Sequence, residues 1–241
     1  MRLRSATLFV LLACVLSGSL AAESGVLEQV FAVTRDVRIS FDPSDSNFNY
    51  GQATRLRTRT LGQRSGEALV LDFDRAAIAT FLDRHRAKPV TARLLIVCRD
   101  VLYAQVATVE VVILDTTAEW TEGGNDNVAA TANEVNFFAA RTGSQQWADA
   151  RGGSVADFRE VFYDKSRDAF TTMVNPHALQ AGPNDKDQQM SVQLDRAFVD
   201  HFARSPTSQG LVLCTRSNAI VDFFSREQTD RGAQLVLSAV E

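Results

Sequence analysis

Three arginines at alternate positions, Arg55, Arg57 and Arg59, are the residues of this sequence best suited to bind an anion. They follow the polar turn-forming stretch DSNFNYG, residues 45–51. Alternate side chains of a β-strand lie on the same face, about 7 Å apart. Guanidinium groups bind carboxylates in a planar, bidentate way, and a uronic-acid polymer carries a carboxylate on about every sugar. The spacing therefore predicts a strand whose arginine face could bind an acidic polysaccharide.

The same arginines have a second interpretation, which the sequence leaves open. A row of charges can lie on the solvated face of a sheet and pair with carboxylates of a neighbouring strand, such as Asp72 or Asp74. In that case the arginines stabilise the sheet and bind no ligand.

Aromatic side chains are the usual stacking partners of sugar rings, because the C–H face of a sugar packs on an indole or phenol ring. Trp147 lies in the polar segment GSQQWADARGG and is the best candidate, with Tyr50 beside the arginines as a second. Trp120 is more typical of core or edge packing. Tyr103 and Tyr163 are further candidates.

Two loops rich in Asp and Asn, residues 41–51 and 182–189, could supply part of a structural calcium site. Calcium prefers six to eight oxygen ligands from carboxylates, amides and carbonyls. We expect Asp36 and Asp42 to be the contributors if such a site exists. Asp and Asn are also ordinary turn residues, because their side chains bond to the local backbone.

The sequence does not predict an enzyme. Glu119 and Glu122 are separated by two residues, which is no indication of the paired carboxylates of glycoside hydrolysis. No metal-binding, nucleophile-elbow or phosphate-loop motif is present. The three histidines are scattered through different segments: His85, His177 and His201.

Short alternating runs recur along the chain and predict an all-β fold. About ten strand candidates are separated by Gly, Asp, Asn and Pro, which is typical of an antiparallel sandwich. Helical spacing of apolar residues predicts short helices in DRAAIATFLDRHRA, residues 74–87, and LDRAFVDHFARSP, residues 194–206. Residues 127–153 read as a helix and a loop. No linker divides the chain, so residues 23–241 are expected to form one domain.

The N-terminus reads as a secretory signal peptide over residues 1–22, with Arg2 and Arg4 before an apolar run and small residues at its end. Cys14 follows Leu-Leu-Ala, so lipoprotein anchoring is a minor alternative. The apolar run is shorter than the roughly 20 residues of a spanning helix, and no membrane span is expected. The mature protein would therefore be secreted, extracellular or periplasmic.

Export allows Cys98 and Cys214 to form a disulfide, and we expect one between them, with two separate buried thiols as the alternative. The net charge of −4 does not favour nucleic acid as a partner. The oligomeric state is not indicated.

Several motifs, taken in order, resemble the DNRLRE-type modules, which are secreted jelly-roll domains that include alginate-binding carbohydrate-binding modules. These motifs are Asp36, Asn49-Tyr50-Gly51, Thr54 to Arg59, Trp120 with Glu122, and the C-terminal stretch VDFFSREQTDRGAQLVLSAV. The family's Thr-Trp-Asn segment is replaced here by GGNDNVAATANEVNFF. The resemblance implies an antiparallel jelly-roll β-sandwich with two or three short helices.

We therefore expect non-catalytic binding of an extracellular polysaccharide, with an acidic glycan such as alginate as the first candidate. Arg55, Arg57 and Arg59 would supply the charge, and Trp147 and Tyr50 the stacking. No cofactor is required, and a structural calcium is an optional addition. A structural or adhesive surface module that acts through protein–protein contacts is the alternative, and an unusual lyase or hydrolase is a third option.

Overall fold

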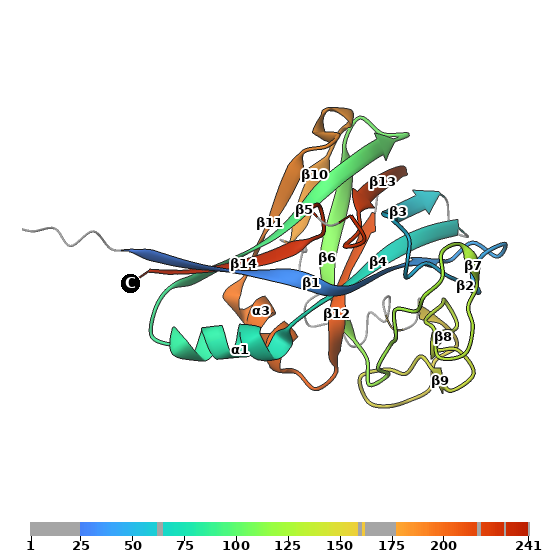
Figure 1. Cartoon of the computed structure of the whole chain (residues 1–241), viewed down its shortest axis with the longest axis horizontal. Helices are drawn as coiled ribbons and strands as arrows, with labels where there is room; N and C mark the ends of the chain where they lie inside the picture. Colours follow the sequence, from blue (N-terminus) through green and yellow to red (C-terminus); the bar gives the residue numbers. More distant parts are fainter. Residues whose placement is uncertain are drawn as a thin grey trace, which may run out of the picture.

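The computed structural model describes residues 25–61, 65–158, 161, 177–215, 218–228 and 230–240. The predicted signal peptide, Cys14 and Tyr163 lie outside the described residues. The described chain is mostly antiparallel β-sheet with two short helices, which confirms the predicted all-β sandwich (Figure 1).

The helices are α1 (Arg75–Arg84), α3 (Arg196–Arg204) and the 3-10 turn η1 (Pro183–Asp185). The strands are β1 (Val26–Ser40), β2 (Phe48–Asn49), β3 (Arg55–Leu61), β4 (Ser65–Phe73), β5 (Val90–Leu102), β6 (Ala107–Asp115), β7 (Val128–Ala129), β8 (Ala139–Arg141), β9 (Gln145–Gln146), β10 (Ala178–Ala181), β11 (Gln189–Leu194), β12 (Ser208–Thr215), β13 (Ala219–Phe224) and β14 (Gln234–Val240).

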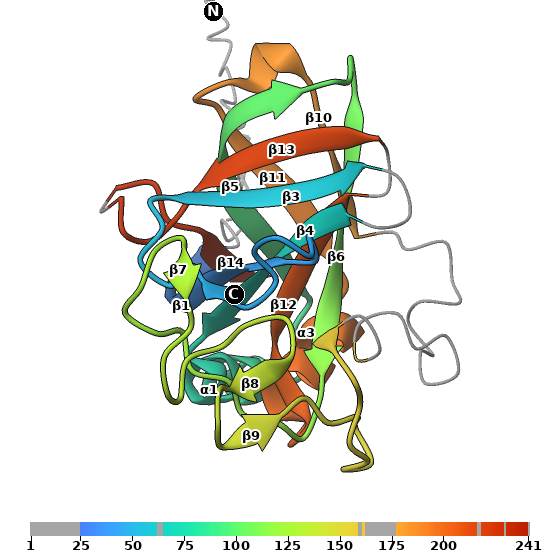
Figure 2. The ribbon, with the colours of Figure 1, turned by 90° about the vertical axis from the view of Figure 1, so that its right-hand side faces the viewer.

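One ten-stranded sheet bends into the sandwich. Its order is β1-β14-β5-β13-β3-β4-β12-β6-β10, with β11 beside β5 and a further pairing of β1 with β4. The two longest strands belong to both layers. The first half of β1 pairs with β14 and the second half with β4, while β5 pairs first with β14 and β11 and then with β13. Figure 2 shows β13, β3 and β4 side by side, with β6 and β12 crossing behind them.

The strands bury two separate hydrophobic clusters. Successive residues of a strand lie on opposite faces, so Leu69 and Leu71 of β4 pack in the inter-sheet cluster. Ala68 and Val70 of the same strand pack in a second cluster, the loop-side cluster, together with Trp120 and other residues of the loops at that face. Both faces of β4 are therefore covered.

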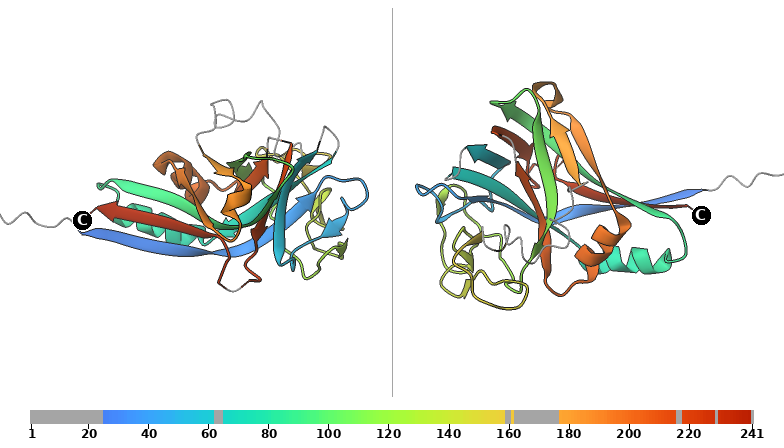
Figure 3. Two further views of the ribbon diagram at one scale, coloured as in Figure 1. Left: turned by 90° about the horizontal axis from the view of Figure 1, so that it is seen from above. Right: turned by 180° about the vertical axis from the view of Figure 1, so that it is seen from behind.

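The two predicted helices lie together along one side of the sandwich, as Figures 1 and 3 show. Asp74 caps α1 by accepting a hydrogen bond from the Ala77 amide at 2.9 Å. The apolar stripe of α3, which includes Phe198 and Phe202, is buried in the inter-sheet cluster. Both helices match the predicted segments.

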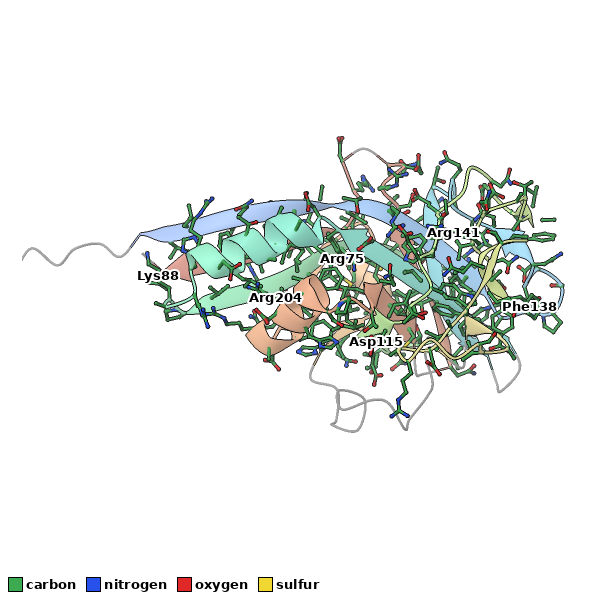
Figure 4. All side chains as sticks on the ribbon, turned by 90° about the horizontal axis from the view of Figure 1, so that it is seen from below. Arg75, Lys88, Asp115, Phe138, Arg141 and Arg204 are labelled. Carbon is green, nitrogen blue, oxygen red and sulfur yellow. The ribbon has the colours of Figure 1, made fainter. Side chains whose placement is uncertain are left out.

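The segment 127–153 contains no helix, which contradicts the predicted helix and loop. It folds as short strands and turns, β7, β8 and β9, against the second face of the sheet (Figure 2). Its apolar residues serve the loop-side cluster, and the Phe138 side chain at its tip is 47% exposed. Figure 4 shows Phe138 at this end of the molecule and Lys88 at the other.

The predicted disulfide is not present among the described residues. Cys98 and Cys214 are both buried thiols. Cys98 packs in the inter-sheet cluster, and Cys214 packs in the loop-side cluster. The bond fails because the two side chains belong to clusters on opposite faces of the sheet. Within the same part of the chain, every helix is too short or too polar to cross a membrane.

Candidate functional site

A groove with two adjoining hollows lies beside β3, β13 and β5. The first hollow has a volume of about 510 Å³ and the second about 450 Å³. Thr54, Arg55 and Arg99 line both hollows, so the two form one depression, which we call the arginine groove. Arg57 and Arg59 line the first hollow. All three arginines of the predicted row thus lie in the groove.

Arg57 is held by the sheet itself. The strand register places Arg57 opposite Asp222 of β13, which is opposite Asp100 of β5. Arg57 donates two hydrogen bonds to the Asp222 carboxylate, from Nε at 2.7 Å and from Nη2 at 3.0 Å. This bonding raises the pKa of Arg57 above its ordinary value. Most of the positive charge of Arg57 is therefore neutralised within the protein.

Arg59 is shared between two carboxylates. Its Nη2 lies 3.5 Å from Asp42 Oδ2 and 3.6 Å from Glu67 Oε1. Glu67 is directly opposite Arg59 in the pairing of β3 with β4. Arg59 thus links Glu67 of β4 to Asp42 in the loop that follows β1.

Arg55 and Arg99 have only weak ties to carboxylates. The Arg55 side chain is 42% exposed and lies 3.7 Å from Asp222 Oδ2, an oxygen that already accepts from Arg57. In the described part of the chain no carboxylate pairs with Arg99, whose guanidinium lies 5.7 Å from the centre of the Phe224 ring. The sequence did not indicate Arg99, because only the pairing of β5 with β13 and of β13 with β3 brings it near Arg55.

The carboxylate partners of the row differ from those expected. Asp72 pairs with Arg35 at 2.5 Å and lies 3.6 Å from Arg75, and Asp74 caps α1. Neither carboxylate lies on the groove. The partners are Asp222, Glu67 and Asp42 instead, because β13 and not the far end of β4 runs beside the arginines.

The predicted stacking residues Trp147 and Tyr50 are wrong, because both side chains are fully buried. The Trp147 indole donates to the Asn136 carbonyl at 3.0 Å within the loop-side cluster. The Tyr50 hydroxyl donates to Asp45 at 2.7 Å, and the Arg38 guanidinium lies 3.7 Å above its ring. Trp120 is buried, as expected.

Two other aromatic side chains can meet a ligand. Phe224 lines the second hollow. Tyr103 is 77% exposed and adopts a positive φ of 64°, which is unusual for a bulky residue. It directly follows β5, which pairs with β13 beside the groove. Phe224 and Tyr103 therefore replace Trp147 and Tyr50 as the candidates.

The two predicted calcium ligands, Asp36 and Asp42, bond to different parts of the chain. The Asp36 carboxylate is buried and accepts a hydrogen bond from the Arg226 amide at 2.7 Å. Burial raises its pKa to about 7. Asp42 accepts from the amide and hydroxyl of Ser44, which lower the pKa of Asp42. The described residues hold no cluster of three or more His, Cys, Asp or Glu side chains suited to a metal ion.

The motif residues behind the family resemblance bond to one another. Glu122 accepts from the Asp36 amide at 2.8 Å and from Arg226 at 2.8 and 2.5 Å. The Asn49 side chain donates to the Glu122 carbonyl at 2.7 Å. A Cβ added to Gly51 would overlap that same carbonyl. These residues hold β1, the turn after β13 and two loops together, which is a structural role.

Comparison with known proteins adds no relative: the chain matches no protein-family model and no curated protein.

Proposed function

We propose that the protein binds an extracellular acidic polysaccharide in the arginine groove without catalysing a reaction on it. The observation that carries the proposal is the pair Arg55 and Arg99. These two arginines come from different strands, line both hollows, and have no bidentate carboxylate partner. A carboxylate of a uronic acid fits between two guanidinium groups, since charge-assisted hydrogen bonds are the strong ones.

The other members of the groove suit a sugar polymer. Asp100 and Asp187 line the second hollow and can accept hydrogen bonds from sugar hydroxyls, with Phe224 beside them as an apolar surface. Alginate is the first candidate ligand, as the resemblance to the DNRLRE-type modules implies. The expected export of the chain would place it where such polymers occur.

A structural or adhesive module is the second candidate. Two observations favour this structural role. Arg57 is paired with Asp222, and Asp36, Glu122 and Arg226 bond to one another. Residues with such partners stabilise the fold whether or not a ligand binds.

The test is retention of the mature chain on alginate, pectin and a neutral glucan at low and moderate salt. We expect salt-sensitive retention on the two uronate polymers and a loss of about 10-fold or more in affinity in the Arg55→Ala/Arg99→Ala variant, since hydrogen bonds to charged groups contribute about 1.5–3 kcal/mol. The matched control is Arg93→Ala/Arg204→Ala, which removes two arginines exposed to a similar degree outside the groove. Equal retention of both variants, or no retention of the wild-type chain on any polymer, would favour the structural module.

A further inference from the structure

The inner end of the arginine groove contains a buried carboxylate surrounded by guanidinium groups. Glu67 is 4% exposed and lies 3.7 Å from Arg38, 3.8 Å from Arg57 and 3.6 Å from Arg59. All three distances exceed that of a hydrogen bond. The three arginines come from β1 and β3, and Glu67 comes from β4, so the arrangement depends on the sheet and not on a loop.

Several polar atoms of this cluster have no hydrogen-bond partner. They are Oε2 of Glu67 and the Nε atoms of Arg38 and Arg59, and all three side chains line the first hollow. Buried polar atoms are nearly always bonded, and leaving one without a partner costs about 1–3 kcal/mol. The guanidinium groups of Arg38 and Arg59 are therefore incompletely bonded within the protein.

The donors outnumber the acceptors around Glu67. In the described residues Glu67 is the carboxylate that pairs with Arg38, and the Tyr50 ring fixes the guanidinium from the other side. The first hollow is lined by five arginines and four carboxylates: Arg38, Arg55, Arg57, Arg59, Arg99, Asp42, Asp45, Glu67 and Asp126. Asp222 pairs with Arg57 from outside this hollow, so a protonated Glu67 would leave a surplus of one positive charge.

Glu67 is the carboxylate of this cluster that can give up its charge. Burial raises its pKa above the ordinary value, and Asp45 adds to this, while the three arginines act in the opposite direction. Asp45 accepts from the Ser40 and Tyr50 hydroxyls. The pKa of Asp42 is lowered by Ser44, so Asp42 stays ionised.

We propose that the inner end of the arginine groove holds the carboxylate of a second uronic-acid residue between Arg38 and Arg59, and that Glu67 takes up one proton from solvent as this carboxylate binds. The ligand carboxylate stays ionised and replaces the charge that Glu67 loses. Arg55 and Arg59 are four residues apart on β3, about 13 Å, so the two carboxylates belong to different sugars of one chain. This inference rests on the proposed function.

The experiment is isothermal titration calorimetry of the mature chain with a mannuronate hexamer between pH 4.5 and 8. Uronic acids stay ionised in this range, as carboxyl groups of this kind titrate near pH 3.5. We expect the affinity to rise as the pH falls, by at most about tenfold per pH unit for one linked proton. Repeating the titration in buffers of different ionisation enthalpy measures the proton uptake directly.

The Glu67→Gln variant separates this inference from the proposed function. It should bind the hexamer more tightly than wild type at pH 8 and show no proton uptake. The control is Glu119→Gln, which changes an exposed glutamate paired with Arg141 outside the groove. If Glu67→Gln binds more weakly, or keeps the wild-type pH profile while Arg55→Ala/Arg99→Ala abolishes binding, the proposed function stands and this inference falls.

Two further arms complete the test. If circular dichroism shows that Glu67→Gln does not fold, the Arg38→Lys variant replaces it. This variant keeps the positive charge but removes the Nε donor, and we expect a tenfold loss of affinity for the hexamer at pH 5. An unchanged affinity would overturn the inference. Sodium sulfate is titrated alone: proton-linked binding of sulfate as tight as that of the hexamer would show a general anion site and overturn the assignment to a uronate.

Discussion

Arg55 and Arg57 lie two residues apart on the same face of β3, yet their surroundings give them different roles. Arg57 donates two hydrogen bonds to Asp222, whereas Arg55 remains 42% exposed and 3.7 Å from the same carboxylate. The alternation of the sequence predicts the shared face. It could not predict the difference, because Asp222 comes from a strand 165 residues away. Arg57 therefore positions the groove, and Arg55 contacts the ligand in our proposal.

Asp36 allows a test at the scale of one residue. Its folded-state pKa of about 7 lies above the ordinary 3.8, so the folded state binds more protons between these values. Asp36 thus costs stability above pH 7, and the cost disappears as the pH falls towards 4. Asp36→Asn keeps an acceptor for the Arg226 amide and removes the charge.

We expect Asp36→Asn to raise the free energy of unfolding by about 1–3 kcal/mol at pH 8 and to have no effect near pH 4. Urea unfolding at the two pH values measures this difference. A variant less stable than wild type at pH 8 would show that the ionised form is the one the fold requires.

At the scale of elements, the turn between β13 and β14 depends on one ion pair. Both strands pair with β5, and the described residues of the turn between them are 225–228 and 230–233. Arg226 in this turn binds Glu122 of a distant loop through two hydrogen bonds, and its own amide binds Asp36. The pair thus joins the turn to β1 and to the loop-side face.

A double-mutant cycle tests this junction. Arg226→Ala should destabilise the protein by about 1–3 kcal/mol, because it leaves Glu122 buried beside Asp36 without a counter-charge; the partial exposure of Arg226 keeps the loss below that of a fully buried pair. Glu122→Gln added to Arg226→Ala should recover part of the loss. Urea midpoints measure the coupling, and strictly additive losses would show that the two residues do not act together.

The same scale shows what periodicity can and cannot predict. The strands and both α-helices follow from alternation and from helical spacing, as Phe198 and Phe202 illustrate. The helix predicted within residues 127–153 is wrong because polar and apolar residues mix there without a period. Trp147 looked exposed from its polar neighbours, yet a single indole that finds one acceptor, the Asn136 carbonyl, is readily buried. Local composition does not reveal such a long-range partner.

For the whole molecule, the fold class could be read from the sequence, but the division of the core could not. Strand β4 contributes side chains to both clusters. Leu69 and Leu71 pack in the inter-sheet cluster, and Ala68 and Val70 pack in the loop-side cluster. A run without polar alternation, such as ALVL, signals burial on both faces but not what covers each one. The loops of residues 116–158 cover the second face, and their packing is set by tertiary contacts.

The two thiols lie in different clusters, so the alkylation rate of each one measures how often its own cluster opens. The thiolate is the reactive form, and burial raises the pKa of Cys98 to about 11. Alkylation must therefore wait until the surrounding structure opens. Because irregular loops cover the cluster of Cys214 and strands enclose that of Cys98, we expect Cys214 to be alkylated faster in the absence of denaturant.

Iodoacetamide labelling read by peptide mass spectrometry measures the two rates separately, and they should converge as urea approaches the unfolding midpoint. Equal rates without urea would mean that both halves open in one event. The two native thiols thus report, without any engineered cysteine, whether the loops open independently of the sheet.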